Sequence, residues 1–151
     1  FKDITPVLQD KEAFRYIINH FVERYNKMTI NTVCAIESRG FILGSAIAHG
    51  LGVGFVPIRK AGKLPYESIK ENYDLEYGSN TIEIHKDAIY KGERVLLIDD
   101  LLATGGTARA STNLIKELGG EIVEIAFLVE LAFLKGRKLL EGFDVYSAIV
   151  F

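Results

Sequence analysis

The stretch VLLIDDLLATGGTA, Val95 to Ala108, decides how the rest of the chain is interpreted. Its four leading apolar residues, 95–98, predict a strand that is buried on both faces, as strands of parallel sheets are. Two carboxylates, Asp99 and Asp100, stand where this strand is expected to end, and a helical pattern begins at Gly106 after a short turn. The stretch therefore predicts a strand–loop–helix unit that places polar groups at the carboxyl end of the strand.

The turn between this strand and the helix has the composition of a phosphate site. It consists of Ala103, Thr104, Gly105, Gly106 and Thr107. Backbone N–H groups at a helix N-terminus attract anions, glycines let a phosphate approach the backbone, and threonine hydroxyls add donors. A generic strand–turn–helix explains the glycines equally well, but it does not explain the acidic pair before them. The pattern is neither a P-loop, whose Lys is missing, nor a dinucleotide fingerprint.

The acidic pair suits the sugar of a phosphosugar rather than its phosphate. Asp99 and Asp100 would repel a phosphate, whereas carboxylates accept hydrogen bonds from hydroxyls or bind a Mg²⁺ ion beside them. The cations Arg39, Arg59, Lys60 and Lys63 follow two other predicted strands. A solvated surface explains Lys60 about as well as a binding role does. Together these groups fit a ligand with two separated anionic groups joined by a polyol, such as 5-phosphoribosyl-1-pyrophosphate (PRPP).

The composition indicates one globular domain, residues 1–151. The chain is 48% hydrophobic and 25% charged, and its net charge of −2 argues against broad nucleic-acid or anionic-membrane binding. Cys34 is the single cysteine and fits a reducing compartment, so we expect a cytoplasmic protein. No apolar run is long enough for a membrane helix, and no signal peptide is present. Because the chain starts at Phe1 rather than Met, we expect an N-terminal segment to be missing.

Strand and helix patterns alternate along the chain, which predicts an α/β fold with a central, mostly parallel sheet flanked by helices. Residues up to Pro6 are expected to form a loop, and Asp10 is expected to cap the first helix. We predict strands at 32–36, 55–58, 95–98, 121–131 and 145–150, and helices at 41–49, 106–118 and 133–140. Residues 59–78 lack periodicity and suggest a flexible lid, about 59–85, with a hairpin of strands 73–77 and 81–85.

Several motifs resemble the type I phosphoribosyltransferases, and in particular their adenine-specific members. They are FKDITPVL (1–8), ESRGF (37–41), IRKAGKLP (58–65), LEYG (75–78), DDLLATGGT (99–107), FLVEL (127–131) and LKGR (134–137). The resemblance implies the type I phosphoribosyltransferase fold and the reaction of adenine with PRPP to give AMP and pyrophosphate, a step of purine salvage. It also implies Mg²⁺, held mainly by PRPP, pyrophosphate and water without a direct protein ligand, and a homodimer.

The resemblance also implies residue roles. Residues 103–107 hold the 5′-phosphate, and Asp99 and Asp100 hold the ribose hydroxyls. Pyrophosphate contacts come from Ser38, Arg39, Arg59, Lys60 and Lys63, and base contacts come from Arg39 and Leu131. The catalytic residues are Glu76, Arg59 and Lys63, with Tyr77 beside Glu76 in the lid; Glu76 assists proton transfer at the purine N7.

Two departures from the family and two alternative functions stay open. A hood segment that precedes FKDIT in the family is absent here, and Glu37 stands where some members have Asp. A non-proline cis peptide is expected between Glu37 and Ser38. The alternatives are a phosphoribosyltransferase for another purine base and a non-catalytic PRPP-sensing regulatory domain. The presence of Arg59, Lys63 and Glu76 favours an enzyme.

Overall fold

A single mixed sheet organises the protein, in a computed structural model that describes residues 2–75 and 77–151. Within these residues seven strands form the sheet, in the order β3-β4-β2-β1-β5-β6-β7. The strands are β1 Thr32–Ile36, β2 Gly54–Lys60, β3 Ser68–Asp74, β4 Ser79–His85, β5 Arg94–Leu102, β6 Glu121–Glu130 and β7 Val145–Val150. The five strands from β2 to β7 in this order run parallel, and β4 and β3 extend the sheet antiparallel. The predicted α/β fold is therefore confirmed.

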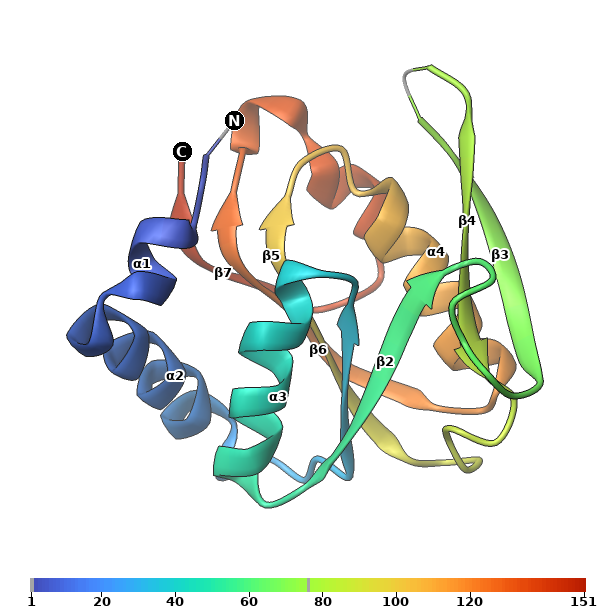
Figure 1. Ribbon diagram of the computed structural model, residues 1–151, viewed down its shortest axis with the longest axis horizontal. Coiled ribbons are helices and arrows are strands. Elements are labelled where there is room, and N and C mark those ends of the chain that lie inside the picture. The colour runs from blue at the N-terminus through green and yellow to red at the C-terminus, as the bar shows by residue number, and fades with distance from the viewer. Residues whose placement is uncertain (1, 76) are drawn as a thin grey trace.

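Helices cover both faces of the sheet (Figure 1). The helices are α1 Thr5–Gln9, α2 Lys11–Tyr25, α3 Arg39–Leu51 and α4 Gly106–Glu117, followed by the 3₁₀ turns Ala132–Leu134 and Gly136–Leu140. Side chains alternate along each strand, so Leu96 and Ile98 pack toward α2 and α3 whereas Val95 and Leu97 pack toward α4. Burial on both faces explains why the central strands are almost entirely apolar. No helix of the described chain is long and apolar enough to cross a membrane.

The central strand is longer than predicted. β5 continues past Ile98 to Leu102 and stays paired with β6 up to the contact of Leu102 with Glu130. Asp99 and Asp100 are therefore strand residues rather than loop residues, and their side chains point to opposite faces of the sheet. The prediction failed because two adjacent carboxylates look like the end of a strand.

The N-terminal segment and the lid also differ from the predictions. Residues up to Pro6 were expected to form a loop, yet α1 begins at Thr5 with Pro6 in its first turn, where the missing N–H costs nothing. The first hairpin strand is β3, which begins at Ser68 instead of residue 73 and pairs along its full length with β4. Its sequence SIKENYD is polar enough to hide the alternation, and Gly78 forms the turn with a φ of +91°.

Candidate functional site

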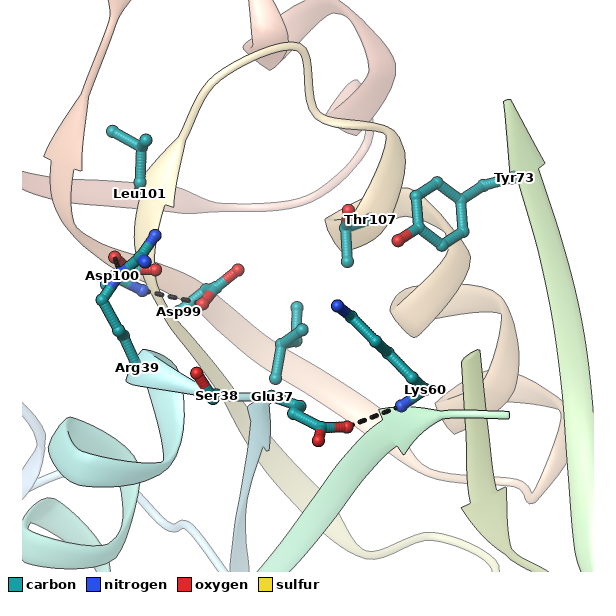
Figure 2. A pocket seen from close by; sticks show the side chains of 10 residues that line it. Glu37, Ser38, Arg39, Lys60, Tyr73, Asp99, Asp100, Leu101 and Thr107 are labelled. Carbon is teal, nitrogen blue, oxygen red and sulfur yellow. Dashed lines mark hydrogen bonds and ion pairs between the residues drawn. The ribbon is translucent and has the colours of Figure 1, made fainter. Parts of the chain in front are cut away.

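A pocket of about 430 Å³ opens at the carboxyl ends of β1 and β5 (Figure 2). It is lined by Ile36, Glu37, Ser38, Arg39, Lys60, Tyr73, Asp99, Asp100, Leu101 and Thr107. The β1–α3 connection, the end of β5, the start of α4 and the β3 strand of the hairpin each supply part of this wall. The fold thus brings together side chains that the sequence analysis assigned to three different parts of PRPP.

The two carboxylates at the pocket floor differ in their surroundings. Asp100 is 6% exposed and accepts a hydrogen bond from Arg39 Nε at 2.6 Å. This contact is also an ion pair, and Arg39 is the first residue of α3. Asp99 accepts a bond from the Asp100 amide at 2.9 Å through Oδ1. Burial, and next the neighbouring charge of Asp100, raise the pKa of Asp99. Asp100 is therefore fixed in an ion pair with Arg39, whereas the charged form of Asp99 is disfavoured unless a ligand donates a hydrogen bond to it.

Helix α3 can begin beside Asp99 because its second residue is Gly40. A Cβ at this position would lie 2.8 Å from Asp99 Oδ1 and 3.3 Å from the Ile98 carbonyl oxygen. The glycine thus lets the N-terminal turn of α3 contact β5, and this contact places Arg39 within reach of Asp100. Within the ESRG motif, the glycine is therefore explained by packing against β5 as well as by the chemistry of ligand binding.

A second hollow of about 80 Å³ adjoins the pocket at the start of α4. It is lined by Asp99, residues 101–108 and Phe127. In the part of the chain that the structure describes, none of the backbone amides of residues 103–107 donates a hydrogen bond to a protein acceptor. Gly105 is the N-cap of α4 and has a φ of +90°. Unused amides at the N-terminus of a twelve-residue helix form an anion site.

Gly136 packs closely against the backbone of the 103–107 loop. A Cβ on Gly105 would lie 2.5 Å from the Gly136 carbonyl oxygen, and a Cβ on Gly136 would lie 2.4 Å from the Ala103 carbonyl oxygen. Two glycines therefore allow the backbones of the 103–107 loop and the 3₁₀ turn to touch. The LKGR motif, which the sequence analysis noted only as part of the resemblance, contributes this contact.

Three cations belong to the end of β2 and to the loop that follows it, and only one of them lines the pocket. Lys60 lines the pocket, whereas Arg59 and Lys63 are not part of its wall. Arg59 donates from Nη2 to Glu37 Oε1 at 3.0 Å and from Nη1 to the Lys63 carbonyl at 3.3 Å. Glu37 also accepts from the Lys60 amide at 2.8 Å. Although burial acts to raise the pKa of Glu37, the bonds from Arg59 and Lys60 outweigh it and lower that pKa.

Two of the other predicted site residues, Leu131 and Tyr77, lie away from the pocket wall. Leu131 is 7% exposed and packs in the core cluster between the sheet and helices α1–α3. Tyr77 is 89% exposed at the hairpin tip, and Glu76 lies outside the described residues. The roles given to these three residues stay predictions. The cis peptide predicted between Glu37 and Ser38 is present.

Four residues of the pocket wall have no role assigned from the sequence: Ile36, Glu37, Tyr73 and Leu101. Tyr73 comes from β3, and its hydroxyl points into the pocket toward Thr107 and Lys60 (Figure 2). The half-buried residues Ile69, Glu71 and Tyr73 alternate with exposed or partly exposed ones along the strand. This alternation could have indicated that the strand has a buried face, but the charged residues of the segment obscure it.

Comparison with known proteins gives consistent matches over the full chain. The family described as "Phosphoribosyl transferase domain" matches residues 7–145. The adenine phosphoribosyltransferase of Thermotoga maritima is 55% identical over 151 residues, which cover 100% of this chain and 87% of that protein. The corresponding protein of Halothermothrix orenii is 55% identical over 149 residues, 99% of this chain and 88% of that protein.

Solved structures agree with the sequence matches. The crystal structure of adenine phosphoribosyltransferase from Thermoanaerobacter pseudethanolicus has a TM-score of 0.97 and 52% identity, and the match covers 100% of this chain and 88% of that one. The Trypanosoma brucei enzyme, in complex with AMP, pyrophosphate and ribose-5-phosphate, has a TM-score of 0.93 and 33% identity, with coverage of 99% and 69%.

Proposed function

Because the chain belongs to the adenine phosphoribosyltransferases, enzymes that convert adenine and PRPP into AMP and pyrophosphate, we propose that its two adjoining hollows divide PRPP between them. The smaller hollow takes the 5′-phosphate and the larger one takes the ribose and the pyrophosphate. The observation that carries this proposal is the set of unused amides at residues 103–107, next to the carboxylates of Asp99 and Asp100. A phosphate bound there would leave the ribose hydroxyls facing the acids.

The reaction develops opposite charges at two places. The anomeric carbon becomes cationic like an oxocarbenium ion, while the departing pyrophosphate gains negative charge. Fixed cations at the leaving group stabilise that transition state. We assign this role to the cations Arg39 and Lys60 on the pocket wall, Arg59 of β2 and Lys63 of the loop that follows β2. Ser38, also on the wall, would donate a hydrogen bond from its hydroxyl to the pyrophosphate. Arg59 must then share its guanidinium between pyrophosphate and Glu37, which holds it at 3.0 Å.

The lid and the base site complete the proposal. The β3–β4 hairpin stands beside the start of α4, where it would exclude water from the reactive sugar (Figure 1). Glu76 assists proton transfer at the purine N7, with Tyr77 beside it, and Arg39 and Leu131 contact the base. These roles rest on the motif resemblance.

Mg²⁺ is proposed to arrive with the substrate. Among the described residues, no three His, Cys, Asp or Glu side chains are grouped to hold a metal ion. Magnesium often keeps several waters and binds through substrate phosphates, so PRPP, pyrophosphate and water would hold the ion without a direct protein ligand. When bound, the ion would neutralise charge on the pyrophosphate. A homodimer and a cytoplasmic location are likewise proposed from the family resemblance and, for the location, from the buried free thiol of Cys34.

A pyrophosphate-release assay with PRPP, Mg²⁺ and a panel of bases tests the proposal. We expect release with adenine and much less with hypoxanthine, guanine or xanthine. Release with a different base would reassign the base specificity. PRPP binding without release of pyrophosphate for any base would indicate a regulatory domain instead of an enzyme.

A further inference from the structure

A buried carboxylate outside the pocket wall anchors the loop that follows β2. Glu83 lies in β4 and is 2% exposed. Its Oε1 accepts a hydrogen bond from the Leu64 amide at 3.0 Å, and its Oε2 accepts one from the Ser68 hydroxyl at 3.1 Å. Lys63, which is proposed to contact pyrophosphate, directly precedes the anchored Leu64.

The surroundings of Glu83 keep it charged. Burial acts to raise the pKa of Glu83, but the hydrogen bonds from Leu64, Gly62 and Ser68 outweigh it, so the pKa is lowered. Lys70 of β3 and Arg59 of β2 stand directly opposite Glu83 on its two neighbouring strands. A charged acceptor buried at this point holds backbone amides more strongly than a neutral acceptor would.

Other contacts fix the same loop, residues 61–67. The Ala61 amide donates to the Thr81 carbonyl at 3.0 Å, and Arg59 donates to the Lys63 carbonyl at 3.3 Å. Gly62 makes the bend with a φ of +84°, a conformation that favours glycine. The loop backbone is therefore held along its first half, while the Lys63 side chain remains exposed.

We infer that Glu83 is a positioning residue for the pyrophosphate half of the site: by holding the Leu64 amide and the Ser68 hydroxyl, it sets the direction in which Lys63 and Arg59 present their charges. This inference rests on the proposed binding of PRPP. Glu83 acts through the loop and does not touch the substrate. Its contribution therefore concerns ligands that carry pyrophosphate and not those that carry only the 5′-phosphate.

The substitution Glu83→Gln tests this inference, because it keeps the shape of the side chain but removes its charge, so that the amide oxygen holds the Leu64 amide less strongly and the NH₂ group faces Ser68. We expect the KM for PRPP to rise about tenfold, the scale of one lost charge-assisted hydrogen bond. We expect the Kd of AMP, measured by calorimetry, to stay within about twofold, because AMP carries no pyrophosphate. A general loss of stability would change both constants together.

Glu124→Gln is the matched control. Glu124 is also a buried carboxylate, 8% exposed, but its partners are Arg24 and Tyr25, on α2. We expect this variant to lower the melting temperature without raising the KM for PRPP relative to the Kd of AMP. If Glu83→Gln does not fold, Ser68→Ala removes a single bond to the same carboxylate, and we expect it to raise the KM for PRPP about threefold.

The Lys63→Ala variant separates the inference from the proposed function. A raised KM for PRPP in Lys63→Ala, with no change in either Glu83→Gln or Ser68→Ala, would overturn the positioning role of Glu83 and leave the proposed pyrophosphate contact intact. An unchanged KM in Lys63→Ala would instead remove Lys63 from the pyrophosphate site. Parallel changes for PRPP and AMP in Glu83→Gln would also overturn the inference.

Discussion

Arg39 and Asp100 form an ion pair, with 2.6 Å between Nε and Oδ2, that joins the first residue of α3 to the acidic segment of β5. The side chain of Asp100 is 8% exposed and that of Arg39 is 43% exposed, so a buried anion holds a cation at the rim of the pocket. The hydrogen bond and charge of Asp100 raise the pKa of Arg39. Asp100 thus orients a guanidinium to which we assign contacts with both pyrophosphate and the base.

The variant Asp100→Asn should lose both functions of this carboxylate. It removes an acceptor for the ribose hydroxyls and releases Arg39 from its fixed position. We expect kcat/KM for PRPP to fall about a hundredfold, or roughly 2.7 kcal/mol. Arg39→Lys keeps the charge but loses the planar guanidinium, and we expect a fall of about tenfold. Steady-state kinetics with PRPP as the varied substrate measures both. Unchanged kcat/KM in Asp100→Asn would remove Asp100 from the ribose site.

The phosphate loop should be intolerant of a side chain at Gly105. In Gly105→Ala, the Cβ would meet the Gly136 carbonyl oxygen, and the φ of +90° would be strained as well. We expect the affinity for ribose 5-phosphate to fall more than about tenfold, because the loop amides must shift. Isothermal titration with ribose 5-phosphate measures this affinity.

Gly142→Ala is the control for backbone strain. Gly142 has a φ of +93°, but a Cβ there meets nothing within 4 Å. We expect this variant to lose about 1 kcal/mol of unfolding free energy and to bind ribose 5-phosphate normally. If both variants bound the ligand equally well, the tight packing of Gly105 against Gly136 would not matter for phosphate binding.

Tyr73→Phe tests whether the hairpin contributes a polar group to the pocket. The Tyr73 ring packs beside the start of α4, where a Cβ on Gly106 would lie 3.6 Å from Tyr73 Cδ2, and the hydroxyl points into the pocket (Figure 2). We expect the KM for PRPP to rise about fivefold while the melting temperature stays unchanged, because one hydrogen bond to substrate is lost. Tyr90→Phe, at a residue that is 75% exposed, should change neither value. An unchanged KM in Tyr73→Phe would leave the hydroxyl without a binding role.

The sequence predicted the parallel core well because apolar strands and helix stop signals are local. Strands 32–36 and 145–150 have the predicted bounds, and α4 begins at Gly106 as predicted. Some of the errors concern residues that serve the site as well as the fold. The acids of β5 look like a strand end, although pairing with β6 continues past them. The sequence of β3 is polar because one of its faces is open to solvent, and only its other face packs against α4.

Part of the site could be predicted from local sequence and part could not. The loop 103–107 and its acids were identified from a continuous motif, and the structure places them around two adjoining hollows. The anchoring of that loop by Gly136, and the hydrogen bonds that Glu83 accepts from Leu64 and Ser68, join residues that are distant in sequence. Such contacts depend on strand order and register, which residue spacing does not encode.

The variant Asp99→Asn should raise the stability of the protein and lower its catalytic activity. Because the pKa of Asp99 is raised in the fold, the folded state binds its proton more tightly than the unfolded state does. The stability linked to this proton is present at low pH and is lost as the pH rises from the ordinary aspartate value, near 3.8, through the raised one. The amide oxygen of the substituted side chain could still accept the bond from the Asp100 amide, but it carries no charge at any pH.

We therefore expect Asp99→Asn to increase the free energy of unfolding at neutral pH by roughly 0.5–2 kcal/mol, the range of a typical single stabilising substitution. The gain should shrink toward zero as the pH is lowered below the ordinary aspartate range, because wild-type Asp99 is then protonated in both states. Urea unfolding of both proteins between about pH 3 and pH 8 measures the difference, in which contributions from carboxylates that do not interact with Asp99 cancel. At neutral pH the same variant should lose most of its kcat/KM for PRPP, since a charged acceptor for the ribose hydroxyls is gone. A variant that is less stable than wild type at neutral pH would show that the Asp99 carboxylate supports the fold, contrary to the stability cost that burial and Asp100 imply.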